Sequence, residues 1–217
     1  MRCPLDTRVV SIAGLLMLLA ACSSDSVVAP KHRRTAPPGA PRAEVIMNSV
    51  ADDSMSADFT VTPEGGTFKL GKHAVIFPAN AICDPATSSY GPGTWDEPCT
   101  AVDTAVSFHA EIRGDSTGAI IAFTPSVRFV PTDNPEQYAW IMMSNPAVAT
   151  AEDPSQFAIL WVMDDGTMVD EAKDDPTLAT YLYTDQGIVY RRIKHFSAYN
   201  CWGAVMAELS DVVPVEY

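Results

Sequence analysis

Short segments with alternating apolar side chains, separated by turn residues, occupy residues 58–203. The clearest example is 102–112, in which Val102, Phe108 and Ile112 fall on one face and polar residues on the other. Side chains of a strand alternate between its two faces, so this pattern predicts a strand with one buried face. Glycine-, proline- and aspartate-containing turns recur between such segments, and no convincing amphipathic helix interrupts them. This organisation predicts an all-β fold, an antiparallel β-sandwich over residues 58–203.

The last strand-like segment is the longest and is apolar or aromatic on both faces, which predicts a strand covered on both sides. Strict alternation would place four of its residues on one face, namely His195, Ser197, Tyr199 and Cys201. Phe196, Ala198, Asn200 and Trp202 would lie on the other. The full set of expected strands is 59–62, 67–70, 73–77, 102–112, 119–124, 127–130, 138–143, 157–163, 168–169, 178–183 and 188–202.

Residues 1–21 have the features of an export signal peptide. Arg2 and Arg8 supply positive charge, and the apolar run 9–19 is too short to span a bilayer, which needs about 20 residues. The run ends in Leu19-Ala20-Ala21-Cys22, which resembles the bacterial lipobox, a motif whose cysteine is diacylated and becomes the new N-terminus. Ser23 stands where an aspartate would resemble an inner-membrane retention signal, so we expect a lipid-anchored protein of the bacterial outer membrane. The alternative is an ordinary secretory signal that contains a cysteine.

Residues 22–57 are predicted to be the lipidated cysteine followed by a disordered tether, because Ser, Pro, Ala and Gly dominate them without periodicity. A coil of this length would extend on the order of 30 Å. The basic residues of the tether would lie near anionic headgroups, or else in a solvated linker: Lys31, Arg33, Arg34 and Arg42. A C-terminal tail, 204–217, is expected to form a short helix at 204–209 and then fray.

The cysteines support an oxidising compartment. Cys83 and Cys99 bracket a loop rich in Pro, Gly and Ser, and a loop of this length lacks its own core, which predicts a disulfide between them. Cys3 leaves with the signal peptide and Cys22 is used by lipid. Cys201 is therefore expected to be a buried free thiol in the last core strand.

Composition excludes several functions. The net charge of −13 argues against nucleic acid as a partner, and no phosphate-binding loop or dinucleotide fingerprint occurs. We expect no cofactor and no metal, because no histidine has zinc-site spacing; calcium at the acidic segment 164–175 is left open. Tyr90, Trp95 and Trp140 are treated as exposed aromatics that could line a protein or glycan site, with ordinary packing as the equal alternative.

Three segments resemble the ZU-five domain family, which includes domains of netrin receptors, ankyrins and the function-to-find domains of inflammasome sensors. They are Gly65-Gly66-Thr67-Phe68 followed by Val75-Ile76-Phe77-Pro78, then Leu160-Trp161-Val162 with Asp165-Gly166-Thr167, and finally His195-Phe196-Ser197. Together they cover the whole predicted domain. The loop between Cys83 and Cys99 departs from the family's opening, which leaves the first strand register open.

Self-processing members of that family break their own chain at a serine that follows His-Phe. The resemblance implies that Ser197 attacks the Phe196 carbonyl, with His195 accepting the hydroxyl proton. The alternative is a core strand in which His195 and Ser197 are merely hydrogen-bonded. We prefer a membrane-anchored envelope lipoprotein whose sandwich is a non-catalytic binding or structural module, not an enzyme. A self-processing domain, cut between Phe196 and Ser197 with its halves still associated, is the alternative function.

Overall fold

The computed structural model describes residues 36–47, 56–114 and 118–203. The predicted signal peptide, Cys22 and the tail 204–217 lie outside the described residues, as does most of the predicted tether.

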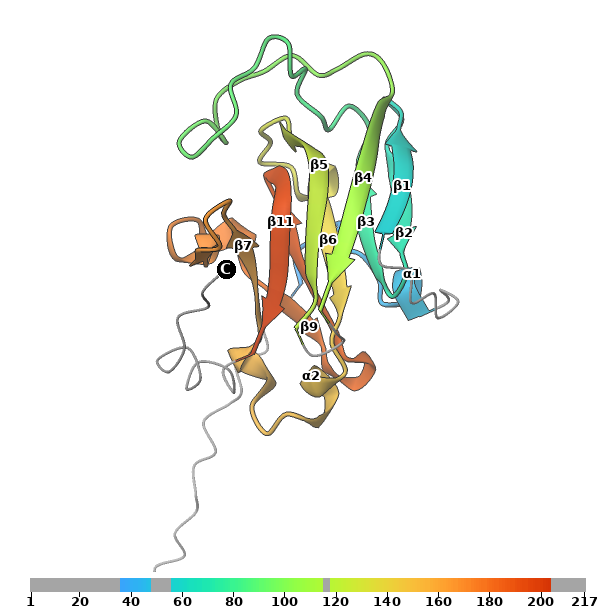
Figure 1. Cartoon of the computed structure of the whole chain (residues 1–217), viewed down its shortest axis with the longest axis vertical. Coiled ribbons are helices and arrows are strands. Elements are labelled where there is room, and N and C mark those ends of the chain that lie inside the picture. The colour runs from blue at the N-terminus through green and yellow to red at the C-terminus, as the bar shows by residue number, and fades with distance from the viewer. Residues whose placement is uncertain (1–35, 48–55, 115–117, 204–217) are drawn as a thin grey trace, which may run out of the picture. The chain divides into compact units, whose positions relative to one another are not determined.

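Eleven strands form two antiparallel sheets, which confirms the all-β prediction. Strand β11 lies between β5 and β7 in the first sheet (Figure 1). In spatial order, that sheet is β1 (Ser56–Val61), β4 (Val106–Arg113), β5 (Ile120–Arg128), β11 (His195–Trp202), β7 (Ala158–Val162) and β8 (Met168–Val169). The second sheet is β2 (Gly66–Leu70), β3 (His73–Phe77), β6 (Ala139–Ser144), β10 (Ile188–Ile193) and β9 (Tyr181–Tyr183).

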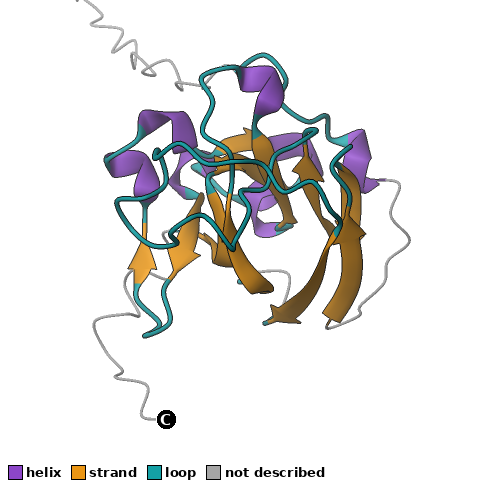
Figure 2. Ribbon diagram, turned by 90° about the horizontal axis from the view of Figure 1, so that it is seen from above, coloured by secondary structure: helices purple, strands orange, loops and turns teal. Residues whose placement is uncertain are grey.

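Helical pieces are short and lie between strands. The long connection 78–105 between β3 and β4 instead crosses over one end of the strands (Figures 1 and 2). The helices are α1 (Glu44–Met47) and α2 (Ala147–Thr150), and the 3-10 turns are η1 (Pro135–Gln137), η2 (Pro154–Gln156), η3 (Glu171–Lys173), η4 (Pro176–Leu178) and η5 (Thr184–Gln186).

The main core lies between the two sheets and takes side chains from both. In β4 the predicted alternation is confirmed: Phe108, Ala110 and Ile112 are buried, whereas Ser107 and His109 are exposed. The second sheet contributes apolar residues of β3, β6 and β10 to the same core. Burying such a side chain stabilises the fold by about 1.5–3 kcal/mol, so this alternation is what pairs the two layers.

The predicted strand 188–202 is wrong as one strand. It divides at Lys194 into β10, in the second sheet, and β11, in the first. The Lys194 side chain forms ion pairs with Asp96 (2.5 Å) and Asp175 (2.6 Å), and its carbonyl accepts a hydrogen bond from the Phe129 N–H. These contacts hold the crossing point at the edge of the sandwich. Although β10 contains Arg191 and Arg192, it is buried along its whole length. The charged residues before the crossing therefore do not mark an exposed turn in the sequence.

The predicted faces of the last strand are also wrong, because β5 bulges opposite Ser197 and the register of the pair shifts there. Phe196 pairs with Val127, yet Ala198 pairs with Ala122, so one residue of β11 lies opposite four residues of β5. Pro125 lies in that stretch and has no N–H to donate to the ladder. Past the bulge the side-chain parity changes. Phe196, Tyr199 and Cys201 therefore all enter the same core, which strict alternation forbids.

Part of the predicted tether is packed on the second sheet. Residues 36–47 include α1 and lie against a second apolar cluster that contains Trp140 and Tyr190. Ala43 is buried there, and the Tyr183 hydroxyl donates a 2.6 Å hydrogen bond to the Pro41 carbonyl. For these residues the tether prediction is wrong, because the aromatic residues that they cover come from distant strands.

Candidate functional site

The predicted site residue His195 opens β11 and is fully buried. Its ring lies nearly parallel to that of Trp95, with centroids 4.1 Å apart and an interplanar angle of 14°. Trp161 approaches the imidazole edge-on at 4.9 Å. Trp95 comes from the disulfide-closed loop and Trp161 from β7, so the imidazole is enclosed by segments distant in sequence.

A carboxylate orients the imidazole. Glu171, the first residue of η3, lies 3.0 Å from His195 Nε2 through Oε1 and accepts a 2.7 Å hydrogen bond from Arg191 through Oε2. Arg191 is fully buried in β10 and also donates to the Ile159 carbonyl at 2.7 Å. Both carboxylate oxygens of Glu171 and the guanidinium of Arg191 therefore have hydrogen-bond partners, as the burial of charged groups requires.

The pKa values of His195 and Glu171 are both lowered from their ordinary values. Burial lowers the pKa of His195, although the Glu171 carboxylate favours its protonated form. Burial alone would raise the pKa of Glu171, but the His195 hydrogen bond and the Arg191 charge outweigh it, and that pKa is lowered. At neutral pH the carboxylate is ionised and the imidazole is neutral. Its proton then belongs on Nε2, which faces Glu171, and Nδ1 carries the free lone pair.

Two tyrosine hydroxyls surround Nδ1 of His195. Tyr90 Oη and Tyr199 Oη each lie 3.5 Å from it. Each hydroxyl donates a shorter bond to a backbone carbonyl: Tyr90 to Phe196 (2.7 Å) and Tyr199 to His195 (2.6 Å). The acceptors are the carbonyls of two successive peptide links, 195–196 and 196–197.

Ser197 lies at the bulge, and its Oγ is buried without a hydrogen-bond partner. No hydrogen bond joins it to His195 among the described residues. The Ser197 and Ser126 hydroxyls both favour ionisation of Tyr90, although burial dominates and raises the pKa of that phenol. Tyr90 therefore interacts with both members of the predicted pair. A buried, unpaired hydroxyl costs about 1–3 kcal/mol. Three other buried polar atoms of the described residues also lack a partner, namely Arg128 Nε, Trp161 Nε1 and Asn200 Oδ1.

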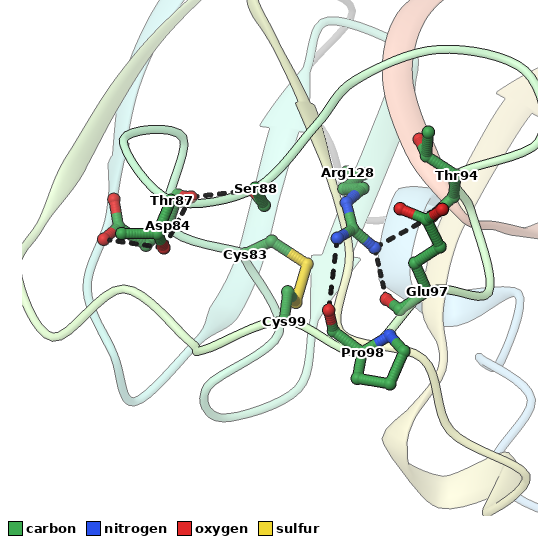
Figure 3. The surroundings of a disulfide bond; sticks show 9 residues. All are labelled: Cys83, Asp84, Thr87, Ser88, Thr94, Glu97, Pro98, Cys99 and Arg128. Atoms are coloured by element: carbon green, nitrogen blue, oxygen red, sulfur yellow. Dashed lines mark hydrogen bonds between the residues drawn. A yellow bond between two sulfur atoms is a disulfide. The ribbon is translucent and has the colours of Figure 1, made fainter.

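The loop that carries Tyr90 and Trp95 is fastened at several points. The predicted disulfide between Cys83 and Cys99 is confirmed, with Cα atoms 5.6 Å apart. Arg128 of β5 donates hydrogen bonds from Nη1 to the Thr94 carbonyl (2.9 Å) and the Glu97 carbonyl (2.5 Å), as Figure 3 shows. It also donates from Nη2 to the Pro98 carbonyl at 3.4 Å. Together with the Lys194–Asp96 ion pair, these bonds hold the loop over the first residues of β11.

Other predicted candidates have structural roles. Cys201 is buried and free, as predicted; burial raises the pKa of its thiol to about 11, and Asn145 Nδ2 lies 3.3 Å from its sulfur. Trp140 is 2% exposed, so of the two alternatives given for it ordinary packing is confirmed and a surface site is excluded.

The acidic segment 164–175 is explained by its turns. Asp165, Asp170 and Asp175 each accept a hydrogen bond from the backbone N–H two residues later, which stabilises tight turns. Across the described ranges, no group of three or more His, Cys, Asp or Glu side chains could hold a metal ion. Glu171, in the same segment, is directed at His195. Sequence reasoning missed this role because nothing in a run of carboxylates marks which one is buried.

Comparison with family models, curated proteins and solved structures found no match to this chain. Within residues 36–47, 56–114 and 118–203, no helix is long and apolar enough to cross a membrane.

Proposed function

We propose that this domain cuts its own chain between Phe196 and Ser197. The observation that carries the proposal is the Ser197 hydroxyl, which is buried and unpaired at a bulge two residues after a histidine oriented by Glu171. A nucleophile, a base and a group that orients the base are the parts that activated serines require.

The reaction needs only these groups and water. Ser197 Oγ attacks the Phe196 carbonyl carbon, and His195 Nδ1 accepts the hydroxyl proton. The C–N bond of the 196–197 peptide then breaks, and the proton passes to the departing amine, which leaves an ester. Water hydrolyses that ester to the Phe196 carboxylate and the free Ser197 hydroxyl. Atoms and charges balance, and no cofactor is consumed.

The proposed cellular setting is the bacterial envelope. Leu19-Ala20-Ala21-Cys22 supports a lipid anchor at Cys22, and the disulfide between Cys83 and Cys99 agrees with export to an oxidising compartment. We place the domain on the outer membrane. After cleavage, residues 198–202 would remain paired with β5 and β7, so the short C-terminal piece would stay in the sheet.

A non-catalytic envelope module is the second candidate, and one observation favours it. Phe196 is fully buried and stacked on Phe123, with centroids 4.0 Å apart and an interplanar angle of 9°. Three further phenylalanines, at positions 77, 108 and 129, contact its ring edge-on. A residue with this packing stabilises the sandwich whether or not its carbonyl reacts, and His195 would then only hold the loop 83–99 in place.

Denaturing electrophoresis and intact mass distinguish the two candidates. Freshly synthesised full chain, incubated at neutral pH, should yield a large fragment that ends at Phe196 and a short peptide 197–217. Hydroxylamine should speed their release, because it attacks esters and not amides. Ser197→Ala should abolish both fragments without lowering the thermal midpoint, since it removes only a buried hydroxyl that lacks a partner. If the wild-type chain keeps one intact mass after prolonged incubation, self-cleavage is excluded and the non-catalytic module is the function that is left.

A further inference from the structure

We propose that Tyr90 is a catalytic residue of this self-cleavage: its hydroxyl stabilises the negative charge that forms on the Phe196 carbonyl oxygen. The inference rests on the proposed function and adds a residue from outside the His195-Phe196-Ser197 motif. Tyr90 belongs to the disulfide-closed loop, the part of this chain that departs from the resemblance noted in its sequence.

The geometry places a donor on the reacting atom. The Tyr90 hydroxyl donates a 2.7 Å hydrogen bond to the Phe196 carbonyl oxygen. When Ser197 attacks that carbonyl carbon, the oxygen becomes an oxyanion, and a donor already in place needs no rearrangement at that moment. In other acyl-transfer sites such donors lie 2.7–3.1 Å from the position that the oxyanion takes up, and removal of one slows the reaction by about 10²–10³-fold.

Tyr90 is a suitable donor because its phenol keeps its proton. Burial of the hydroxyl raises its pKa, and the charges of Asp164 and Glu171 act in the same direction. Tyr90 as a residue is 42% exposed, but its hydroxyl is turned inward to the Phe196 carbonyl and His195 Nδ1. The same oxygen lies 3.5 Å from His195 Nδ1, which connects the donor to the general base.

The loop holds the tyrosine in this position. Trp95 packs edge-on against the Tyr90 ring, with centroids 5.0 Å apart. The same indole also stacks on the His195 ring. Arg128 holds the loop backbone through the carbonyls of Thr94 and Glu97, which lie before and after Trp95 in the sequence. The donor is therefore fixed by three independent attachments: the disulfide, the guanidinium and the indole. A fixed donor is what electrostatic stabilisation of an oxyanion requires.

Two variants of Tyr90 separate the effect of its hydroxyl from the effect of its ring. Tyr90→Phe keeps the ring and its contact with Trp95 but removes the donor, whereas Tyr90→Ala removes both. If the hydroxyl acts on the carbonyl, both variants should produce the 197–217 peptide about 10²-fold more slowly than wild type. Full-length chains made in an oxidising cell-free translation reaction, sampled over time, give these rates directly.

Tyr183→Phe is the matched control. It also removes a tyrosine hydroxyl from a backbone carbonyl, that of Pro41 at 2.6 Å, but on the second sheet. Its cleavage rate should equal that of wild type. A Tyr90→Phe rate equal to wild type, with only Tyr90→Ala slowed, would show that the ring merely packs and would overturn the proposal for the hydroxyl. Absence of cleavage in the wild-type chain would overturn the proposed function and this inference together, so the two failures have different signatures.

Discussion

Individual buried histidines make this protein sensitive to mild acid. His73, at the start of β3, is 7% exposed and accepts a hydrogen bond from the Ser144 N–H at 3.2 Å. Burial and, secondarily, the neighbouring Lys72 lower its pKa to about 4. The neutral ring is thus the form that the fold requires, and the same direction holds for His195.

The sign of the resulting pH dependence follows from this direction. Because the folded pKa of His73 lies below its unfolded value of about 6.5, its contribution to stability is complete above that value and falls as the pH drops towards 4. Between about pH 7 and about pH 5, His73 alone should lower the free energy of unfolding by about 2 kcal/mol. Urea unfolding at the two pH values measures this loss.

His73→Asn is the comparison variant, because asparagine keeps an acceptor for the Ser144 N–H but does not titrate. It should show a clearly smaller loss than wild type over the same range. The remainder would come from His195, whose pKa is lowered in the same direction. An equal loss in both proteins would contradict the assignment to His73.

At the scale of elements, the loop 83–99 and strand β11 depend on each other. The rings of Tyr90 and Trp95 join the loop to β7 and β11. Strand β11 in turn leaves His195 and the Phe196 carbonyl for the loop to cover. The covalent closure of the loop therefore matters both for its own order and for the enclosure of the site.

Removal of the disulfide tests this dependence. Cys83→Ser combined with Cys99→Ser should lower the free energy of unfolding by about 3 kcal/mol, because closure of a loop of this length restricts the unfolded chain by that amount. Trp95 fluorescence should also change in the native state as its contact with His195 loosens. Cys201→Ser, which alters a cysteine outside the bridge, provides a comparison in which the loop remains closed. A double variant with unchanged stability and fluorescence would show that the noncovalent contacts of the loop are sufficient to hold it.

At the scale of the whole molecule, the packed segment 36–47 would shorten the chain between the proposed lipid at Cys22 and the domain. Only residues 23–35 separate Cys22 from the first described residues, in place of the whole stretch predicted. Fully extended, they would reach about 45 Å at most. A lipidated Cys22 would thus keep the domain close to the membrane surface.

The lipid anchor is testable by detergent partition. Wild-type protein made in a bacterial host should enter the detergent phase and the membrane fraction, because two or three acyl chains give stable anchoring where one does not. Cys22→Ser should move to the aqueous phase, while Cys3→Ser, which changes a residue of the predicted signal peptide, should behave like wild type. A wild-type protein that is unmodified, soluble and begins elsewhere would contradict the anchor.

Local signals in the sequence were sufficient for much of this fold. Strand β3 has the predicted bounds, and the faces of β4 follow its alternation, because a strand with one buried face must repeat every second residue. The bridge between Cys83 and Cys99 also followed from the sequence, since the compartment and the loop composition both favoured it.

Tertiary structure alone decided where the last strand breaks and which groups meet at its start. The crossing at Lys194 and the bulge at Ser197 depend on partners in β5 and β6, which no local pattern reveals. Glu171 reaches His195 from a turn 24 residues earlier in the chain, and Tyr90 reaches Phe196 across 106 residues. Periodicity reports the environment of a residue's own strand, whereas a site formed by four distant segments exists only after the sheets have packed.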